Sequence, residues 1–311
     1  MIIDLHTQVW SNLDQLGREP AERIRARQTE RLGTLDGSPA AHERAMTCVD
    51  GSLVFAFRSS RLGAHVPNEL IAEFVARDPK RRAGVAAIEP LAPDAAEQVN
   101  AAIRLGFVGV TVSPAAQGFH PAHSDAMEVY EKCAASGLPV FITLGDPLAH
   151  QSMLEFGRPV MWDEVARTVP ELRIVINQLG HPWVDETLTL LAKHEHVYAD
   201  ISGVASRPWQ LYNALLNASA MRVMDKLLFA SGFPRETPAK TIESLYTINA
   251  FSHGTQLPSV PRSLIRGIIE RDAFTCLGIE AHLVPRSDGK AAVAPPAGGG
   301  QRPAGAEFPS S

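Results

Sequence analysis

Polar side chains follow the short apolar segments of this 311-residue chain, and several are of types that bind or activate substrates. His6 and Gln8 come just after the first apolar segment, and Gln178 ends a later one. Because alternate residues of a strand share one face, His6 and Gln8 are expected to point to the same side. An imidazole beside amide groups can move protons and hold a polar ligand by hydrogen bonds. We therefore expect a polar binding site with His6 as its first catalytic candidate.

Other candidates follow the remaining apolar segments. Asp146 and Glu236 are the carboxylates that could act with His6 as catalytic groups. The substrate-binding candidates, besides Gln8 and Gln178, are cationic, hydrogen-bonding or wall-forming residues: Arg58, Thr143, His181, Trp183, Asp200 and Arg235. Arginine suits a carboxylate because its planar guanidinium donates two parallel hydrogen bonds. This set predicts a small polar or carboxylated ligand.

Each candidate also has a purely structural interpretation. His6 could be a buried neutral histidine paired with Gln178 or with a backbone carbonyl. Arg58 could form a structural ion pair, and Arg235 could pair with Glu236 at the surface. Asp146 could simply form a turn, and Asp200 with Ser202 could fix a strand end. His181 and Trp183 could mark the start of a helix.

Eight short segments rich in Val, Ile, Leu and Phe alternate with amphipathic stretches. They are Ile2–Leu5, Leu53–Phe57, Gly84–Ile88, Val108–Val112, Val140–Leu144, Ile174–Gln178, Val197–Ile201 and Leu227–Ser231. Nearly continuous apolarity over about five residues is typical of strands buried on both faces of a parallel sheet. Eight such units within residues 1–284 predict an α/β fold, a (β/α)8 TIM barrel. A doubly wound open sheet is the alternative, but no Gly-rich phosphate-binding motif follows any segment.

Two segments fall outside this alternation. Residues 11–42 are polar and rich in Arg and Glu, and we expect a long inserted loop with a helix, Ala21–Arg31, serving as a lid or an oligomer contact. The sequence therefore leaves open whether the protein forms a homo-oligomer. In residues 285–311, 16 of 27 residues are Ala, Gly or Pro. Such a tail buries too little apolar area to offset its ordering entropy, so it is expected to be disordered.

Charge and composition exclude several functions. The chain has 29 Lys and Arg against 34 Asp and Glu, which argues against nucleic acid as a partner because phosphate binding needs a basic face. It has no run of 18 apolar residues to span a membrane, and its first residues lack the basic region of a signal peptide. Cys48, Cys133 and Cys276 are far apart, as expected of reduced thiols. We expect a cytoplasmic protein with a small-molecule substrate.

Six motifs, in order over about residues 1–280, resemble those of the amidohydrolase-related family of metal-dependent hydrolases and decarboxylases. They are Asp4-Leu5-His6, the segment from Pro67 to Arg81, Gly106-Phe107-Val108-Gly109-Val110, Ser136-Gly137-Leu138-Pro139-Val140, Leu179-Gly180-His181-Pro182-Trp183 and Phe229-Ala230-Ser231-Gly232-Phe233-Pro234. The resemblance implies a TIM barrel with its site at the carboxyl ends of the strands. It also implies a metal ion held by two His of strand one, a His of strand five and an Asp of strand eight, with a further His on strand six.

Compared position by position, the chain departs from this pattern. His6 matches the first His of strand one. The second His is replaced by Gln8, those of strands five and six by Thr143 and Gln178, and the Asp of strand eight by Gly232. A neutral amide is a poor zinc ligand and glycine has no side chain to offer. We therefore expect that the zinc or manganese of the family has been lost and that the chain uses no cofactor.

Three functions follow from these expectations, and we favour an enzyme. The first is an amidohydrolase-type hydrolase of C–N or C–O bonds, or a decarboxylase-like lyase, acting without metal on a small polar or carboxylated substrate. The metal-independent pyrone-dicarboxylate lactonases of the family resemble this case, but their strand-eight carboxylate is missing here. The second is an inactive barrel that binds a small ligand or serves as a subunit of an assembly. The third is an ordinary metal hydrolase with other ligands: His120, His123, His150 and His181.

Overall fold

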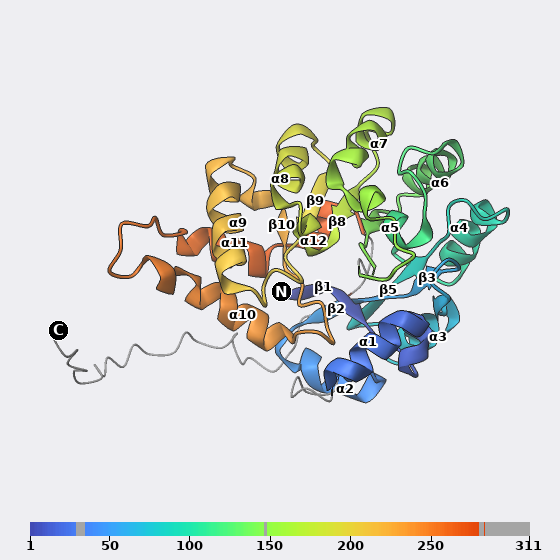
Figure 1. The fold of residues 1–311 in the computed structure, drawn as a ribbon, viewed down its shortest axis with the longest axis horizontal. Helices are drawn as coiled ribbons and strands as arrows, with labels where there is room; N and C mark the ends of the chain where they lie inside the picture. Colours follow the sequence, from blue (N-terminus) through green and yellow to red (C-terminus); the bar gives the residue numbers. More distant parts are fainter. Residues whose placement is uncertain (29–34, 146–147, 280–282, 284–311) are drawn as a thin grey trace.

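In the computed structural model, which describes residues 1–28, 35–145, 148–279 and 283, eight parallel strands form one sheet whose order follows the chain. The strands are β1 (Ile3–Gln8), β2 (Gly51–Phe55), β5 (Arg82–Ala87), β6 (Gly109–Val112), β7 (Val140–Ile142), β8 (Ile174–Ile176), β9 (Val197–Asp200) and β10 (Leu227–Leu228). The amide of Leu5 donates to the carbonyl of Phe229 at 3.0 Å, and that of Gln8 to the carbonyl of Phe233 at 2.9 Å. These bonds join β1 to the segment after β10, so the predicted TIM barrel is confirmed (Figure 1).

The barrel interior is filled by alternate residues of the strands, as the period of two requires. Leu5 of β1 and Phe55 of β2 point inward and are almost fully buried. Phe55 meets Phe141 of β7 edge to face, with 5.1 Å between ring centroids. Phe274 and Leu277 of α12 (Ala273–Leu277) pack against the same cluster. The layer of side chains beneath the site is therefore apolar.

Helices surround the sheet and bury their apolar faces against the outward side chains of the strands (Figure 1). Proline at the first turn opens several of them, as expected where a backbone N–H has no partner. The helices of this layer are α3 (Asn68–Ala76), α4 (Ala95–Arg104), α5 (Pro114–Gln117), α6 (Ser124–Ala135), α7 (Trp162–Thr168), α8 (Val184–Lys193), α9 (Pro208–Ala220), α10 (Pro238–Thr247) and α11 (Arg262–Glu270). Short 3-10 helices are η1 (Leu13–Leu16), η2 (Met46–Cys48), η3 (Leu154–Gly157), η4 (Pro159–Met161), η5 (Asn177–Gly180), η6 (Met224–Lys226) and η7 (Ile248–Ser252).

Two additions modify the regular barrel. The insertion after β1 contains α1 (Arg18–Gln28) and α2 (Pro39–Ala45). The first helix begins three residues earlier than the expected Ala21–Arg31, and residues 29–31 of that prediction lie outside the described residues. After β2, an antiparallel hairpin of β3 (Phe57–Ser59) and β4 (Ala64–Val66) leaves the barrel. Residues 285–311, expected to be a disordered tail, lie outside the described residues.

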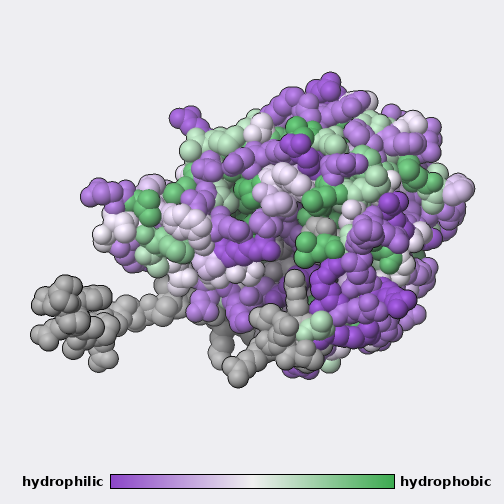
Figure 2. Space-filling model, viewed as in Figure 1, coloured by the Kyte–Doolittle hydropathy of each residue, from purple (hydrophilic) through white to green (hydrophobic). Residues whose placement is uncertain are grey.

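The surface matches the mixed composition. On the face shown in Figure 2, hydrophilic side chains dominate the region over α1 and α2, and apolar patches are small and scattered. Within the described part of the chain, none of the helices has the length and apolarity that crossing a bilayer would require.

Candidate active site

The carboxyl ends of the strands open into a cavity that is partly open to solvent. Four polar side chains from β1 and from the ends of β7 and β8 face it: His6, Gln8, Thr143 and Gln178. Apolar side chains form the remaining wall: Trp10, Leu16, Pro20, Ile24, Leu35, Phe57, Phe233 and Pro234. The cavity therefore pairs a polar floor with an apolar wall, as small-molecule sites commonly do.

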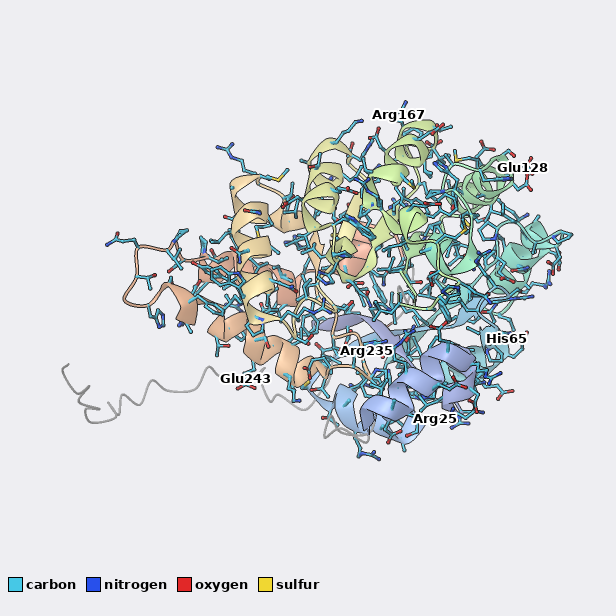
Figure 3. The ribbon with its side chains drawn as sticks, in the orientation of Figure 1. Arg25, His65, Glu128, Arg167, Arg235 and Glu243 are labelled. Carbon is cyan, nitrogen blue, oxygen red and sulfur yellow. The ribbon has the colours of Figure 1, made fainter. Side chains whose placement is uncertain are left out.

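A second, larger hollow adjoins the first and shares Gln178, Gly232 and Arg235 with it. Its charged lining is mainly cationic: Arg23, Arg207 and Arg235 against Glu236. Figure 3 shows Arg235 on the side of the barrel that faces α1. The two hollows together form one mouth whose charged lining residues are mostly arginines, of which Arg23 is paired with Glu19.

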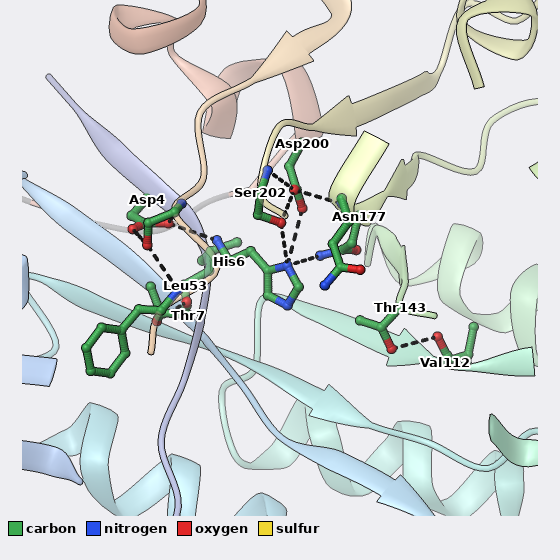
Figure 4. A network of polar contacts seen from close by, with 12 residues as sticks. Asp4, His6, Thr7, Leu53, Val112, Thr143, Asn177, Asp200 and Ser202 are labelled. Carbon is green, nitrogen blue, oxygen red and sulfur yellow. Dashed lines mark hydrogen bonds and ion pairs between the residues drawn. The ribbon is translucent and has the colours of Figure 1, made fainter. Parts of the chain in front are cut away.

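His6 lies at the floor of the mouth, 4% exposed, and its Nδ1 is surrounded by polar atoms (Figure 4). Ser202 Oγ is 3.1 Å from Nδ1, Asn177 Nδ2 is 2.9 Å away and Asp200 Oδ2 is 3.5 Å away. The ring also packs on Phe55, with 4.7 Å between centroids. His6 is thus held on one side by hydrogen bonds and on one face by an aromatic ring.

Asp200 is fully buried and organises the strand ends around His6. Its Oδ1 accepts hydrogen bonds from the amides of Gln178 and Ser202, both at 2.9 Å, and from Ser202 Oγ at 2.5 Å. Gln178 and Leu179 adopt left-handed backbone angles, φ 59° and 52°, which are costly for residues with a side chain. The bond to Asp200 helps to hold this turn, which aims Gln178 into the cavity.

Asp4 supports the site from behind. Its carboxylate accepts from the amide of His6 at 3.2 Å, and from the amide and hydroxyl of Ser231 at 2.9 and 2.5 Å. Burial raises the pKa of Asp4 to about 6, and the hydrogen bonds from Ser231 only partly oppose this shift. Asp4 therefore ties β1 to the segment after β10 at the point where the barrel closes.

The structure brings most of the predicted site residues together. His6, Gln8, Thr143, Gln178 and Arg235 line the first cavity, His181 and Glu236 line the adjoining hollow, and Asp200 lies beneath His6. Burial and the nearby Arg207 lower the pKa of His181, which favours its neutral form.

Two predicted residues, Arg58 and Trp183, are not brought to this place, and a third is not described. Arg58 lies on the β3–β4 hairpin, where its Nε is 3.0 Å from Glu89 Oε2, and it lines neither hollow. Trp183 precedes α8 and also lies outside both linings. Asp146 is outside the described residues. The roles predicted for these three side chains stay predictions.

Sequence reasoning missed Asn177 as a contact of His6, and it treated Ser202 only as a support of the barrel rim. Asn177 precedes Gln178, so strict alternation would turn it away from the site. However, β8 ends at Ile176 and the left-handed turn that follows lets both side chains face inward. For Ser202, the available signal was its spacing of two from Asp200, which places both at the end of β9.

Comparison with known proteins identifies the family. The amidohydrolase family model, Amidohydro_2, matches residues 3–257, and the chain therefore belongs to this family. No curated protein matches the chain in sequence.

Three solved structures illustrate the shared fold. A probable 2-pyrone-4,6-dicarboxylic acid hydrolase from Acinetobacter baumannii with bound citric acid has a TM-score of 0.61 and 16% identity, covering 89% of this chain and 99% of that one. An amidohydrolase from Burkholderia multivorans with bound zinc has a TM-score of 0.66 and 14% identity, covering 90% of this chain and 99% of that one. A dihydroxybenzoic acid decarboxylase from Polaromonas sp. with bound manganese and 2-nitroresorcinol has a TM-score of 0.61 and 16% identity, covering 89% of this chain and 96% of that one.

The zinc and manganese in these structures contradict the expectation that no metal cofactor is involved, since they point to a metal in this family. The donor set of this chain matches such an ion poorly. Among the residues that the structure describes, no three His, Cys, Asp or Glu lie close enough to hold an ion. Gly232 has a left-handed φ of 74°, and an added Cβ would lie 3.1 Å from Ser202 Cβ, so a carboxylate is not readily accommodated there. The described residues therefore do not form the ligand set that zinc needs.

Proposed function

We propose that this protein is a hydrolase or lyase that acts on a small carboxylated molecule bound between His6 and Arg235. The observation that carries the proposal is the position of His6, a buried imidazole with positioned polar partners, at the floor of a cavity with a cationic mouth. Membership of the amidohydrolase family supports the same class of reactions.

The charge of the mouth supports an anionic substrate. Arginines outnumber acids by three to one in the lining of the larger hollow, and Arg235 also reaches the smaller cavity. A guanidinium binds a carboxylate with charge-assisted hydrogen bonds, which are stronger than neutral ones. Of the proteins with this fold, one is a hydrolase of a dicarboxylic acid and another a decarboxylase of a hydroxybenzoic acid, which agrees with this substrate class.

The polar floor supports proton transfer in this pocket. His6 is close enough to a ligand in the cavity to exchange a proton with it, which typically accelerates a reaction by about 10²- to 10⁴-fold. Gln8, Thr143 and Gln178 orient the ligand by hydrogen bonds. The apolar wall, with Trp10 and Ile24, excludes water from the opposite side of the ligand.

The experiment is a turnover screen of the full chain against carboxylated lactones, amides and aromatic acids. Each is paired with an analogue whose carboxylate is replaced by a neutral hydroxymethyl group. Mass spectrometry follows gain of water, as in hydrolysis, or loss of carbon dioxide, as in decarboxylation. We expect turnover of at least one acid and none of its neutral partner. Equal turnover of both members of a pair, or of neutral compounds only, would contradict the proposal.

A further inference from the structure

We propose that Asp200 and Ser202 are positioning residues that hold His6 with its proton on Nδ1, so that Nε2 presents a lone pair to the cavity. Hydrogen-bond geometry alone determines this tautomer. Its consequence for catalysis rests on the proposed function.

The hydroxyl hydrogen of Ser202 is already committed to Asp200. Ser202 Oγ lies 2.5 Å from Asp200 Oδ1, a carboxylate oxygen that can only accept when it is ionised. Ser202 Oγ has one hydrogen to donate, and its remaining capacity is that of an acceptor. The contact of 3.1 Å between Ser202 Oγ and His6 Nδ1 therefore requires the hydrogen to lie on Nδ1.

The second oxygen of Asp200 favours the same tautomer. Asp200 Oδ2 is buried, has no hydrogen-bond partner within the described residues, and lies 3.5 Å from His6 Nδ1. A lone pair on Nδ1 would face this buried negative oxygen, whereas an N–H there meets it favourably. Two acceptors, one of them charged, thus converge on Nδ1.

Asn177 is the neighbour that can adapt. Its Nδ2 lies 2.9 Å from His6 Nδ1, while its Oδ1 is buried and has no partner in the part of the chain that the structure describes. A half-turn of the amide exchanges oxygen and nitrogen without changing its shape, so Asn177 can accept from Nδ1 instead of donating to it. Asp200 and Ser202 can only accept a hydrogen bond from Nδ1, so they determine the tautomer.

The consequence is that His6 acts as a proton acceptor. A water molecule or an O–H of the substrate donates to Nε2. In the reaction its O–H bond breaks, the electron pair stays on oxygen and a new N–H bond forms at Nε2. The imidazolium that results lies beside Asp200 Oδ2, which stabilises it. Stacking on Phe55 keeps the ring in this orientation.

The experiment is ¹⁵N NMR of the full chain labelled at histidine, with the His6 signals assigned by their loss in His6→Asn. We expect Nδ1 in the protonated, pyrrole-type range and Nε2 in the pyridine-type range. In Asp200→Asn the new amide can donate to Nδ1, so the pattern should reverse. Ser202→Ala should lower the fraction with Nδ1 protonated, and it keeps the test open if Asp200→Asn does not fold. Ser113→Ala, which removes a buried hydroxyl without a described partner, is the control.

An Nε2-protonated His6 in the unaltered protein, or a pattern unchanged in both Asp200→Asn and Ser202→Ala, would overturn the inference. Activity gives a second readout. With a substrate from the screen, Asp200→Asn should lower kcat by about 100-fold or more and change KM by less than about threefold. If the NMR pattern is as expected but His6→Asn keeps full turnover, the tautomer stands and the proposed function fails.

Discussion

At the scale of single residues, Arg235 brings a positive charge to the cavity that His6 also lines. It is the one Lys or Arg among the described residues that line the smaller cavity, and it also borders the larger hollow. Arg58, predicted from sequence to bind a carboxylate, pairs with Glu89 on the hairpin instead. Substitution of each arginine therefore distinguishes two positions at which the anionic end of the substrate could bind.

The first prediction compares these arginines. Arg235→Ala should raise KM about 10- to 100-fold, because a hydrogen bond to a charged group contributes about 1.5–3 kcal/mol. Arg58→Ala should leave KM within about twofold, since it loses only a partly exposed ion pair. Steady-state kinetics with an acid from the screen measures both. A large effect of Arg58→Ala with none of Arg235→Ala would place the carboxylate at the hairpin instead.

A second prediction concerns Asp4 and pH. Because burial raises its pKa from 3.8 to about 6, the folded state retains a proton that the unfolded chain releases. The stability contributed by neutral Asp4 is complete below pH ~4 and is lost as the pH rises through ~6. Asp4→Asn imitates the neutral form. Between pH ~4 and ~7, its free energy of unfolding should therefore improve relative to the unaltered protein by about 3 kcal/mol.

Urea unfolding at several pH values within this window measures the difference. Asp272→Asn is the matched control, because hydrogen bonds from Thr275 lower the pKa of Asp272. Its contribution to stability is fully present above the ordinary pKa of 3.8 and is lost only below it, so the difference for Asp272→Asn should stay nearly constant across this window. A difference for Asp4→Asn that stays constant with pH would show that burial does not perturb this carboxyl.

At the scale of elements, α1 covers the mouth of the barrel and is tied to the segment after β7. Glu19 Oε2 accepts from the amide of His150 at 2.8 Å, and Arg23 donates to the carbonyl of Leu148 at 2.7 Å. Pro20 and Ile24 of the same helix line both hollows. The position of α1 therefore determines how far the cavity is closed.

A third prediction follows for this helix. Glu19→Ala removes the acceptor of the His150 amide and an ion-pair partner of Arg23, so α1 should open more often. We expect hydrogen exchange of the His150 amide to become about tenfold faster, corresponding to about 1.4 kcal/mol. Glu22→Ala is the control, because Glu22 is on the same helix and pairs with the exposed Arg18. Equal exchange in the two variants would mean that the contact does not hold α1.

The strands and turns also show how much of the fold could be predicted from the sequence. All eight strands lie where apolar segments predict them, because burial on both faces leaves a simple pattern. Strand ends were harder to place. Leu53–Phe57 was expected to be one strand, but β2 ends at Phe55 and Phe57 begins the hairpin, which carries Arg58 to Glu89. The left-handed turn at Gln178 depends on a bond to Asp200 that no local pattern records.

At the scale of the whole molecule, the net charge of −5 and the cationic mouth have opposite signs. An anionic ligand is therefore attracted locally to the mouth of an otherwise acidic protein, as charged clefts can do. The barrel and the family were predictable from ordered motifs. The hydrogen-bond network around His6 was not predictable, since it joins β1 to the residues that follow β8 and β9.

The central claim is that the reaction takes place at His6, and the most direct test is the kcat of His6→Asn with the best acid from the screen. Asparagine can keep a hydrogen bond to Ser202 but offers no base to the cavity. The account predicts that kcat falls about 100-fold or more while KM stays within about threefold, with Ser113→Ala unchanged. A kcat for His6→Asn equal to that of the unaltered protein would contradict it.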